Sequence, residues 1–381
     1  MKPELKAFLD QSELDAFLYI GDSLCEPDMY YLSRFMASDR FTLLAGEKTS
    51  LLVSSMEAGR ASKESIANEV VSTSEYGIME KLHATGKPDE AYLAVLGEFL
   101  RDRGVRRLGV PLRFPAGIYR DLSRDFDISV VGSPASRWRA VKTDGEISAI
   151  REAQRACEEA MRVAVDLISS SEPKGEVLFR QGEALTSEQV RGKIEVCLLD
   201  RGCEAVDTIV AGGAVAVDPH ARGCGPLPAN EPIVIDIFPR SKQSRYFADM
   251  TRTVLQGEVD RDVEEMYEAV REAQDAGLAA IRAGTSGRDV HAKVVQVFRD
   301  HGYPEREGCG FTHSTGHGVG LNVHELPSLS EVGETLVERN VVTVEPGLYY
   351  PDIGGVRLED LVVVTAKACE NLTHFERKLV L

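Results

Sequence analysis

The stretch FTHSTGHGVGLNVHE, residues 311–325, is the segment around which we expect the rest of this chain to be organised. It contains His313, His317 and His324, three of the eight histidines in the chain, and it ends on Glu325. Histidine and carboxylate side chains are the usual ligands and proton carriers of metal hydrolases, and glycines allow a backbone to approach an ion closely. The stretch is therefore a candidate metal or catalytic site.

The composition is that of an ordinary globular protein and argues against a nucleic-acid partner. The chain has 381 residues, of which 43% are apolar and 28% charged, and this length suits two domains. The net charge is -17, whereas binding of a phosphate backbone depends on clustered Lys and Arg. We therefore expect a protein that binds no nucleic acid.

A membrane location is also not expected. The opening residues, MKPELKAFLDQSELDAF, are interrupted by acids, which does not fit a signal peptide, and no apolar run approaches the length of a membrane span. The seven cysteines are odd in number and form no CxxC pair, which suits reduced thiols. These features predict a cytoplasmic protein.

The chain is expected to form two domains joined by a linker. Residues 1–133 read as a small α/β domain, because strand-like segments alternate with helical ones such as residues 88–104. The strand-like segments are DAFLYI (15–20), RFTLLA (40–45), TSLLVSS (49–55), LGVP (108–111) and ISVVG (128–132). We predict a linker at residues 134–145, around the only tryptophan, and a second domain at residues 146–381.

The second domain is predicted to contain an internal duplication. IREAQRACEEAM (150–161) is similar to VREAQDAGLAAI (270–281), and LTSEQVRGKIEVCLLDRG (185–202) is similar to TSGRDVHAKVVQVFRDHG (285–302). The first copy has the longer connection, at residues 170–184. Such a repeat predicts a pseudo-twofold α/β core with a site between its halves. Chance similarity is the alternative, because helices draw on few residue types.

Acidic residues recur within the apolar segments that follow these helices. Asp236 lies in the middle of the strand-like EPIVIDIFPR (231–240), and Asp249 lies in RYFADMTRT (245–253), which is expected to form the second arm of a hairpin. An unpaired carboxylate in such a place is costly, so each acid requires a cation.

Two later strand-like segments repeat the pattern. Glu345 ends the strand in NVVTVEPGLY (340–349), and GGVRLEDLVVV (354–364) contains Glu359 and Asp360. Any one of these acids, taken alone, is more simply explained by exposure to solvent or by pairing with Arg252 or Arg357. Together with His317 they indicate a set of hard ligands for one or two divalent ions.

The ordered series Asp, Asp, His, Glu, Glu in these contexts resembles the metallopeptidase clan of methionine aminopeptidase, aminopeptidase P and prolidase. The resemblance covers about residues 146–381, and HSTGHG, with His313 four residues before His317, is similar to the prolidase and aminopeptidase P branches. YYLSRF (30–35) resembles the additional N-terminal domain of those branches. The implied fold is α/β (α+β), with a C-terminal pseudo-twofold pita-bread domain and a smaller creatinase-like N-terminal α/β domain.

The resemblance also implies a role for each site residue. It places two divalent ions, with Mn, Co, Zn or Fe all chemically admissible, and it makes Asp249 and Glu359 the bridging ligands. His220, in AVDPH, would line the substrate side, and His324, in VHE, would hold the scissile carbonyl. His313 would shape the pocket, and Glu345 would also accept a proton from water. The implied metal ligands are Asp236, Asp249, His317, Glu345 and Glu359.

The implied activity is hydrolysis of the bond between an N-terminal residue and proline, by metal-activated water. The substrate would be an Xaa-Pro dipeptide or a longer peptide, and the enzyme would be a homodimer. One alternative is a metal-free or repurposed relative, such as a creatinase-like hydrolase or a peptide-binding scaffold, which would lack some of the ligands. A nucleotide-binding reading of GHGVGL is weaker, because the third glycine of GxGxxG is missing and no opening βαβ unit is near.

The sequence departs from the family pattern at the hairpin that carries the first two acids. Asp236 and Asp249 are thirteen residues apart, about two more than usual in the family, and an insertion of two keeps the alternation of side chains along both arms. We therefore expect both acids to face the site. In addition, IFPR (237–240) replaces the small residues that are more familiar after the first Asp of the family, which predicts a different rim of the site and a different substrate preference.

Overall fold

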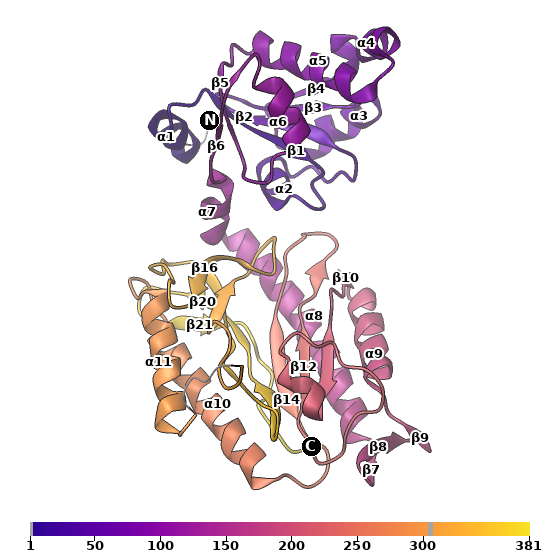
Figure 1. Cartoon of the computed structure of the whole chain (residues 1–381), viewed down its shortest axis with the longest axis vertical. Coiled ribbons are helices and arrows are strands. Elements are labelled where there is room, and N and C mark those ends of the chain that lie inside the picture. The colour runs from indigo at the N-terminus through magenta and orange to yellow at the C-terminus, as the bar shows by residue number, and fades with distance from the viewer. Residues whose placement is uncertain (1–2, 304–307) are drawn as a thin grey trace. The chain divides into compact units, whose positions relative to one another are not determined.

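The computed structural model describes residues 3–303 and 308–381 (Figure 1). The chain divides into two compact units, Met1–Trp138 and Arg139–Leu381, which we call the N-terminal and C-terminal units. Among the residues described, no helix combines the length and apolar character needed to cross a lipid bilayer.

The N-terminal unit is built on one mixed sheet. Its strands follow the order β4-β3-β2-β1-β5-β6, with antiparallel β1–β2 and β2–β3 pairs and parallel β3–β4, β1–β5 and β5–β6 pairs. The elements are α1 (Pro3–Gln11), β1 (Ala16–Gly21), α2 (Pro27–Ser33), β2 (Phe41–Ala45), β3 (Thr49–Val53), α3 (Ser55–Glu64), β4 (Glu69–Ser72), a 3₁₀ turn η1 (Thr73–Tyr76), α4 (Ile78–Thr85), α5 (Pro88–Asp102), β5 (Arg107–Val110), α6 (Ala116–Leu122) and β6 (Asp127–Val130). The small α/β domain expected from the sequence is confirmed.

The predicted linker contains a helix. Helix α7 (Pro134–Ala140) occupies most of residues 134–145, and α8 begins at Asp144 rather than after the linker. Proline at the first helical position fixes a suitable φ angle and loses no hydrogen bond there. The polar, proline-containing composition that indicated a loop therefore marks the start of a helix.

The C-terminal unit contains the two predicted copies of a helix pair followed by strands. The helices are α8 (Asp144–Ser169), α9 (Ser187–Asp200), α10 (Arg261–Ala280) and α11 (Gly287–Asp300). Thr143 and Thr186 form capping boxes with Glu146 and Gln189 at the starts of α8 and α9, and Ser286 caps α11. In Figure 1 α10 and α11 lie to the left of the strands and α9 lies to the right.

Strands follow each helix pair. The first copy contributes the sheet β11-β12-β14 and the second the sheet β16-β15-β17-β20-β21. The longer connection of the first copy forms the small sheet β7-β8-β9. The strands are β7 (Glu172–Lys174), β8 (Val177–Arg180), β9 (Glu183–Ala184), β10 (Cys203–Glu204), β11 (Ile209–Gly212), β12 (Ile233–Ile237), β13 (Arg240–Ser241), β14 (Met250–Val254), β15 (Gly316–Gly318), β16 (Glu325–Leu329), β17 (Val341–Val344), β18 (Gly347–Tyr350), β19 (Gly354–Arg357), β20 (Asp360–Val364) and β21 (Cys369–Asn371), with a 3₁₀ turn η2 (Gly213–Val217).

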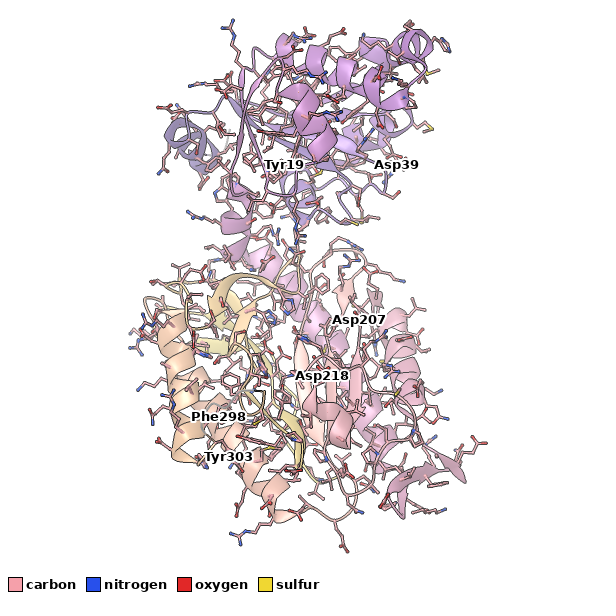
Figure 2. The ribbon with its side chains drawn as sticks, viewed as in Figure 1. Tyr19, Asp39, Asp207, Asp218, Phe298 and Tyr303 are labelled. Atoms are coloured by element: carbon pink, nitrogen blue, oxygen red, sulfur yellow. The ribbon has the colours of Figure 1, made fainter. Side chains whose placement is uncertain are left out.

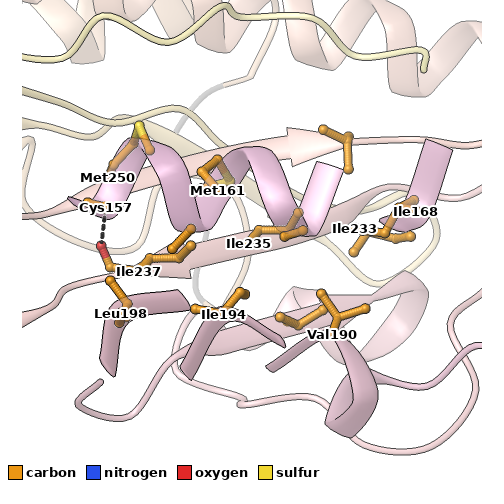
Figure 3. Close-up of a cluster of buried hydrophobic side chains, with 14 of the residues drawn as sticks. Cys157, Met161, Ile168, Val190, Ile194, Leu198, Ile233, Ile235, Ile237 and Met250 are labelled. Carbon is orange, nitrogen blue, oxygen red and sulfur yellow. Dashed lines mark hydrogen bonds between the residues drawn. The ribbon is translucent and has the colours of Figure 1, made fainter. Parts of the chain in front are cut away.

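The core between the first helix pair and its sheet fixes which way β12 faces. Ile233, Ile235 and Ile237 are fully buried against α8 and α9, as Figure 3 shows, and the Cys157 thiol donates a hydrogen bond to the Ile237 carbonyl oxygen at 3.0 Å. Because side chains alternate along a strand, Asp236 must point to the opposite face. The apolar face of β12 therefore directs Asp236 away from the helices.

Candidate metal centre

The hairpin of β12 and β14 places two carboxylates on one face. The strands are antiparallel, with Asp236 opposite Thr251. Asp249 lies two residues before Thr251 and so shares its face. Both carboxylates line the same cavity, which confirms that the longer hairpin keeps both acids facing inward.

The second copy brings His317 to the cavity on β15, where close packing depends on glycine. A Cβ atom on Gly316 would lie 2.0 Å from the Thr343 carbonyl oxygen of β17, a contact that only glycine avoids. The ladder between β15 and β16 shifts its register between His317 and Gly318. The glycines of HSTGHG therefore allow neighbouring strands to approach one another, whereas the sequence suggests that they make room for an ion.

Two threonines orient the acids of the second copy. Glu345 follows β17, and its Oε1 accepts a hydrogen bond at 3.2 Å from Thr343 Oγ1, which itself accepts the His317 amide at 3.0 Å. Glu359 lies between β19 and β20, and its Oε2 accepts a hydrogen bond at 2.8 Å from Thr251 Oγ1. Such outer contacts fix the direction in which a ligand presents its oxygen atoms.

Three of the five predicted ligands are within reach of one another, and a fourth, Glu345, contacts one of them. Ligand atoms of Asp249, His317 and Glu359 all lie within 4.8 Å of each other. His317 Nε2 is 3.2 Å from Glu345 Oε1 and 3.8 Å from Asp249 Oδ2. His317 Nδ1 lies 3.2 Å from the Gly318 carbonyl oxygen, so it carries the proton and leaves Nε2 facing the carboxylates.

Asp236, the fifth predicted ligand, is held by a buried arginine. Asp236 Oδ2 accepts a hydrogen bond at 2.8 Å from Arg357 Nη2, whereas Asp236 Oδ1 is buried without a hydrogen-bond partner. From the sequence, Arg357 is expected only as a possible partner for a strand acid. It is in addition a residue of the site. The available signal in the sequence was its spacing of two from Glu359 in RLE, within a segment expected to be a strand, although in the structure β19 ends at Arg357.

The cavity between the two copies has a volume of about 410 Å³, within the range of ~300–1,000 Å³ usual for ligand sites. It is lined by all eight predicted site residues, His220, His313, His324, Asp236, Asp249, His317, Glu345 and Glu359. Apolar lining comes from Ile209, Pro219, Phe238 and Val323. Phe238 belongs to the longer hairpin, so the part of the sequence that differs from the family pattern contributes a side chain to the cavity wall.

Burial and mutual repulsion dominate the electrostatics of the carboxylates. Burial, with repulsion from neighbouring acids, raises the pKa of Asp249 and of Glu359 well above their usual values, and burial raises that of Asp236 despite Arg357. Burial also acts to raise the pKa of Glu345, but contact with His317 outweighs it and the pKa is lowered to about 2. Glu345 is therefore ionised, whereas the other three carboxylates have too little positive charge around them to offset their burial.

A divalent metal fits this donor set. The cluster combines three buried carboxylates and the half-buried carboxylate of Glu345 with one imidazole nitrogen, and it leaves Asp236 Oδ1 without a hydrogen-bond partner. Buried carboxylates at such density are stable only when a cation compensates them. Oxygen donors with one imidazole suit hard or borderline divalent ions.

The remaining histidines line the cavity beside this cluster. His324 packs edge to face on His317 with ring centroids 4.2 Å apart, and burial together with the nearby His317 lowers its pKa. Burial also lowers the pKa of His313, whose Nδ1 donates to the Ser314 carbonyl oxygen at 2.8 Å and whose Nε2 lies 2.9 Å from the Tyr349 hydroxyl. Both imidazoles are neutral at pH 7.

His220 lies in the exposed segment after η2, and its amide donates to Asp218 Oδ1 at 3.0 Å. Asp207 and Asp218, labelled in Figure 2, flank the strand and turn β11–η2 that precede this segment. Arg357 Nη1 also contacts the Pro219 carbonyl oxygen at 3.4 Å. The histidine of AVDPH is thus at the cavity wall, connected through its neighbour to the buried arginine.

Glu325 and Asp360 lie outside the cavity. Lys142 Nζ donates to Glu325 Oε1 at 2.8 Å, and Arg139 pairs with the other oxygen. Asp360 pairs with Arg252 at 2.8 Å. Both acids are buried and satisfied by cations, so the acidic residue of the 311–325 stretch is no part of the carboxylate cluster.

The fold and the cluster define a metallopeptidase, and comparison with known proteins agrees. Residues 148–366 match metallopeptidase family M24, and residues 3–152 match the creatinase/prolidase N-terminal domain. The chain belongs to metallopeptidase family M24. The chain is therefore a metal-dependent hydrolase with the pita-bread fold, as the sequence resemblance predicted.

Several relatives are similar over nearly the whole chain. A Xaa-Pro dipeptidase from Pyrococcus horikoshii is 30% identical, covering 98% of this chain and 96% of the relative. The crystal structure of the prolidase from Pyrococcus horikoshii superposes with a TM-score of 0.81 at 28% identity, covering 99% and 98% of the two chains. An X-Pro aminopeptidase structure from Thermotoga maritima has a TM-score of 0.80 at 28% identity, covering 97% and 98%.

Proposed function

We propose that this protein is a metal-dependent peptidase that hydrolyses the bond between an N-terminal residue and proline. The observation that carries the proposal is the cavity in which Asp249, His317 and Glu359 present ligand atoms within 4.8 Å of one another. The relatives described as Xaa-Pro dipeptidase and X-Pro aminopeptidase support the choice of substrate.

Asp236, Asp249, His317, Glu345 and Glu359 would hold two divalent ions, with Asp249 and Glu359 shared between them. The short distances between the ligand atoms of Asp249 and Glu359, within 4.8 Å, support this assignment. Bound divalent ions at such a site supply a nucleophilic hydroxide near neutral pH and polarise the scissile carbonyl. Mn, Co, Zn and Fe remain candidates, and we favour manganese because four of the five ligands are carboxylates.

Glu345 and His324 would move and hold the reacting charges. Glu345 Oε1 accepts a hydrogen bond from Thr343, so we assign Oε2 to accept the proton of the attacking water. The same proton then passes to the proline nitrogen as the carbon–nitrogen bond breaks, and proline leaves as a secondary amine. Neutral His324 would donate a hydrogen bond to the oxyanion of the tetrahedral intermediate.

The remaining lining residues would select and orient the substrate. A Xaa-Pro bond is a tertiary amide without an N–H, so the site need not supply an acceptor there. Phe238 and Val323 offer apolar surface to the proline ring or the preceding side chain. His313, held by Ser314 and Tyr349, and His220 would shape the leaving-group side.

The test is metal analysis combined with hydrolysis assays. The purified enzyme should cleave Xaa-Pro, lose activity on chelation and regain it with manganese or cobalt. Full turnover in excess chelator, with no metal bound, would refute the proposal. Rates on Xaa-Pro compared with Xaa-Pro-Xaa then decide between a dipeptidase and an aminopeptidase that accepts longer peptides.

We further propose a cytoplasmic homodimer with its catalytic domain at residues 146–381 and a separate N-terminal domain at residues 1–133. All seven cysteines are free thiols, which supports a reducing compartment. Light scattering of the full chain tests the dimer. A fragment that begins at Arg139 should bind metal without the N-terminal domain, and a folded fragment that binds none would exclude this division.

A further inference from the structure

The buried ion cluster of Glu325, Arg139 and Lys142 lies immediately beside the loop that joins His317 to His324. The exposed fractions of the three side chains are 5%, 5% and 1%. Burial alone would raise the pKa of Glu325, but Lys142 and Arg139 outweigh it and lower that pKa. Glu325 is therefore an ionised carboxylate, held by two cations in the interior of the C-terminal unit.

The Glu325 carboxylate also closes the loop at residues 319–324. Glu325 pairs with Gly318 across the β15–β16 ladder, and its Oε2 accepts the Asn322 amide at 3.4 Å. A Cβ atom on Gly320 would lie 2.2 Å from Glu325 Oε1, so the carboxylate fills the space within the loop. The Phe247 amide donates to the Gly320 carbonyl oxygen at 2.8 Å from outside.

His324 is the last residue of this loop and immediately precedes Glu325. Its ring lies on His317 and faces the cavity, whereas the side chain of the next residue, Glu325, contacts Arg139 and Lys142. His324 lies in the bend that precedes β16, and Glu325 is the first residue of that strand. Fixing the Glu325 carboxylate therefore fixes the peptide from which the His324 ring projects.

We propose that Glu325, anchored by Arg139 and Lys142, is a positioning residue that holds His324 at its place in the reaction. The inference rests on the proposed function of the site, in which His324 stabilises the oxyanion. A buried ion cluster adds little net stability compared with apolar packing, but it fixes the direction of the side chains that it joins. Rate depends steeply on that direction, because a displacement of about 1 Å can cost roughly 10²-fold.

The test is a double-mutant cycle with Glu325→Gln and His324→Ala, measured on the metal-loaded full chain with an Xaa-Pro substrate. Glu325→Gln should lower kcat about tenfold or more in the unaltered background, with KM and metal content unchanged. In the His324→Ala background the same change should lower kcat less than about twofold, because the group through which Glu325 acts is gone.

Asp360→Asn is the matched control, because Asp360 is a buried carboxylate paired with Arg252 outside the cavity. Its effect on kcat should be the same factor in both backgrounds. If Glu325→Gln does not give folded protein, Lys142→Met, which leaves Arg139 paired with Glu325, takes its place in the cycle. Equal factors for Glu325→Gln in both backgrounds, or no loss of kcat, would overturn the inference.

Hydrogen exchange gives a readout that does not depend on activity. Amides of residues 319–324 should exchange faster in Glu325→Gln and at an unchanged rate in Asp360→Asn, and unchanged exchange in both would also overturn the inference. Hydrolysis of Xaa-Pro by the unaltered enzyme separately tests the proposed function. The two proposals can therefore fail independently.

Discussion

Replacing Arg357 with methionine should destabilise the metal-free protein much more than the metal-loaded protein. Arg357 is 4% exposed and donates to Asp236 Oδ2 at 2.8 Å, to the Tyr349 hydroxyl at 2.8 Å and to Thr251 Oγ1 at 3.1 Å. Methionine keeps much of the volume and removes the charge. Asp236 then has a buried carboxylate with no cation near it in the absence of metal.

The size of the effect follows from this loss. Breaking a buried ion pair by removing one partner costs ~3–5 kcal/mol, and for a unit of this size each kcal/mol lowers Tm by ~2–4 °C, so the metal-free Tm should fall by about 10 °C. Bound metal restores a cation to Asp236, so the fall should be clearly smaller in the loaded protein. The rise in Tm on adding metal is therefore larger in the variant than in the unaltered protein.

Calorimetry of both forms, with and without saturating manganese, measures this difference. Arg252→Met is the control, because Arg252 is equally buried but pairs with Asp360, which does not line the cavity. It should lower Tm by the same amount in both forms. An equal loss in both forms for Arg357→Met would show that Arg357 serves general stability and that Asp236 is no ligand.

His317→Ala should lose metal and activity together, whereas His324→Ala should keep its metal and lose ~10²–10³ in kcat, as expected for an oxyanion donor. Metal content is measured together with kcat, and loss of metal in His324→Ala with retention in His317→Ala would reverse the two assignments. Phe238→Ala should raise KM for Xaa-Pro about tenfold with little change in kcat, since it removes uniform apolar contact, and an unchanged KM in initial-rate assays would place the substrate elsewhere. Burial and neighbouring acids raise the pKa of Asp249 and of Glu359, so a binding metal ion must displace protons from them and metal affinity should rise with pH. Calorimetric titration with metal in buffers of different ionisation enthalpy measures the protons released, and finding none would contradict this prediction.

Much of the fold and of the candidate site follows from local patterns in the sequence. In β12 the isoleucines at 233, 235 and 237 face the helices, and this period of two already directs Asp236 to the other face. The same rule predicted that Asp249 would face inward from the longer hairpin. The repeated helix pair was visible because each copy must bury the same kind of apolar face against its own sheet.

The partners of the charged residues could be decided only by the tertiary structure. From the sequence, Glu325 belongs to the candidate site only as the end of the stretch 311–325, and its carboxylate instead reaches Arg139 and Lys142. The sequence also leaves Arg357 as one of several possible partners for an acid, whereas folding brings Arg357 of β19 to Asp236 of β12, a strand of another sheet. The alternation of side chains along a strand is a local property of the sequence. The cationic side chain that pairs with a given acid comes from a distant segment, and only the packing of the two copies against each other determines which cationic side chain that is.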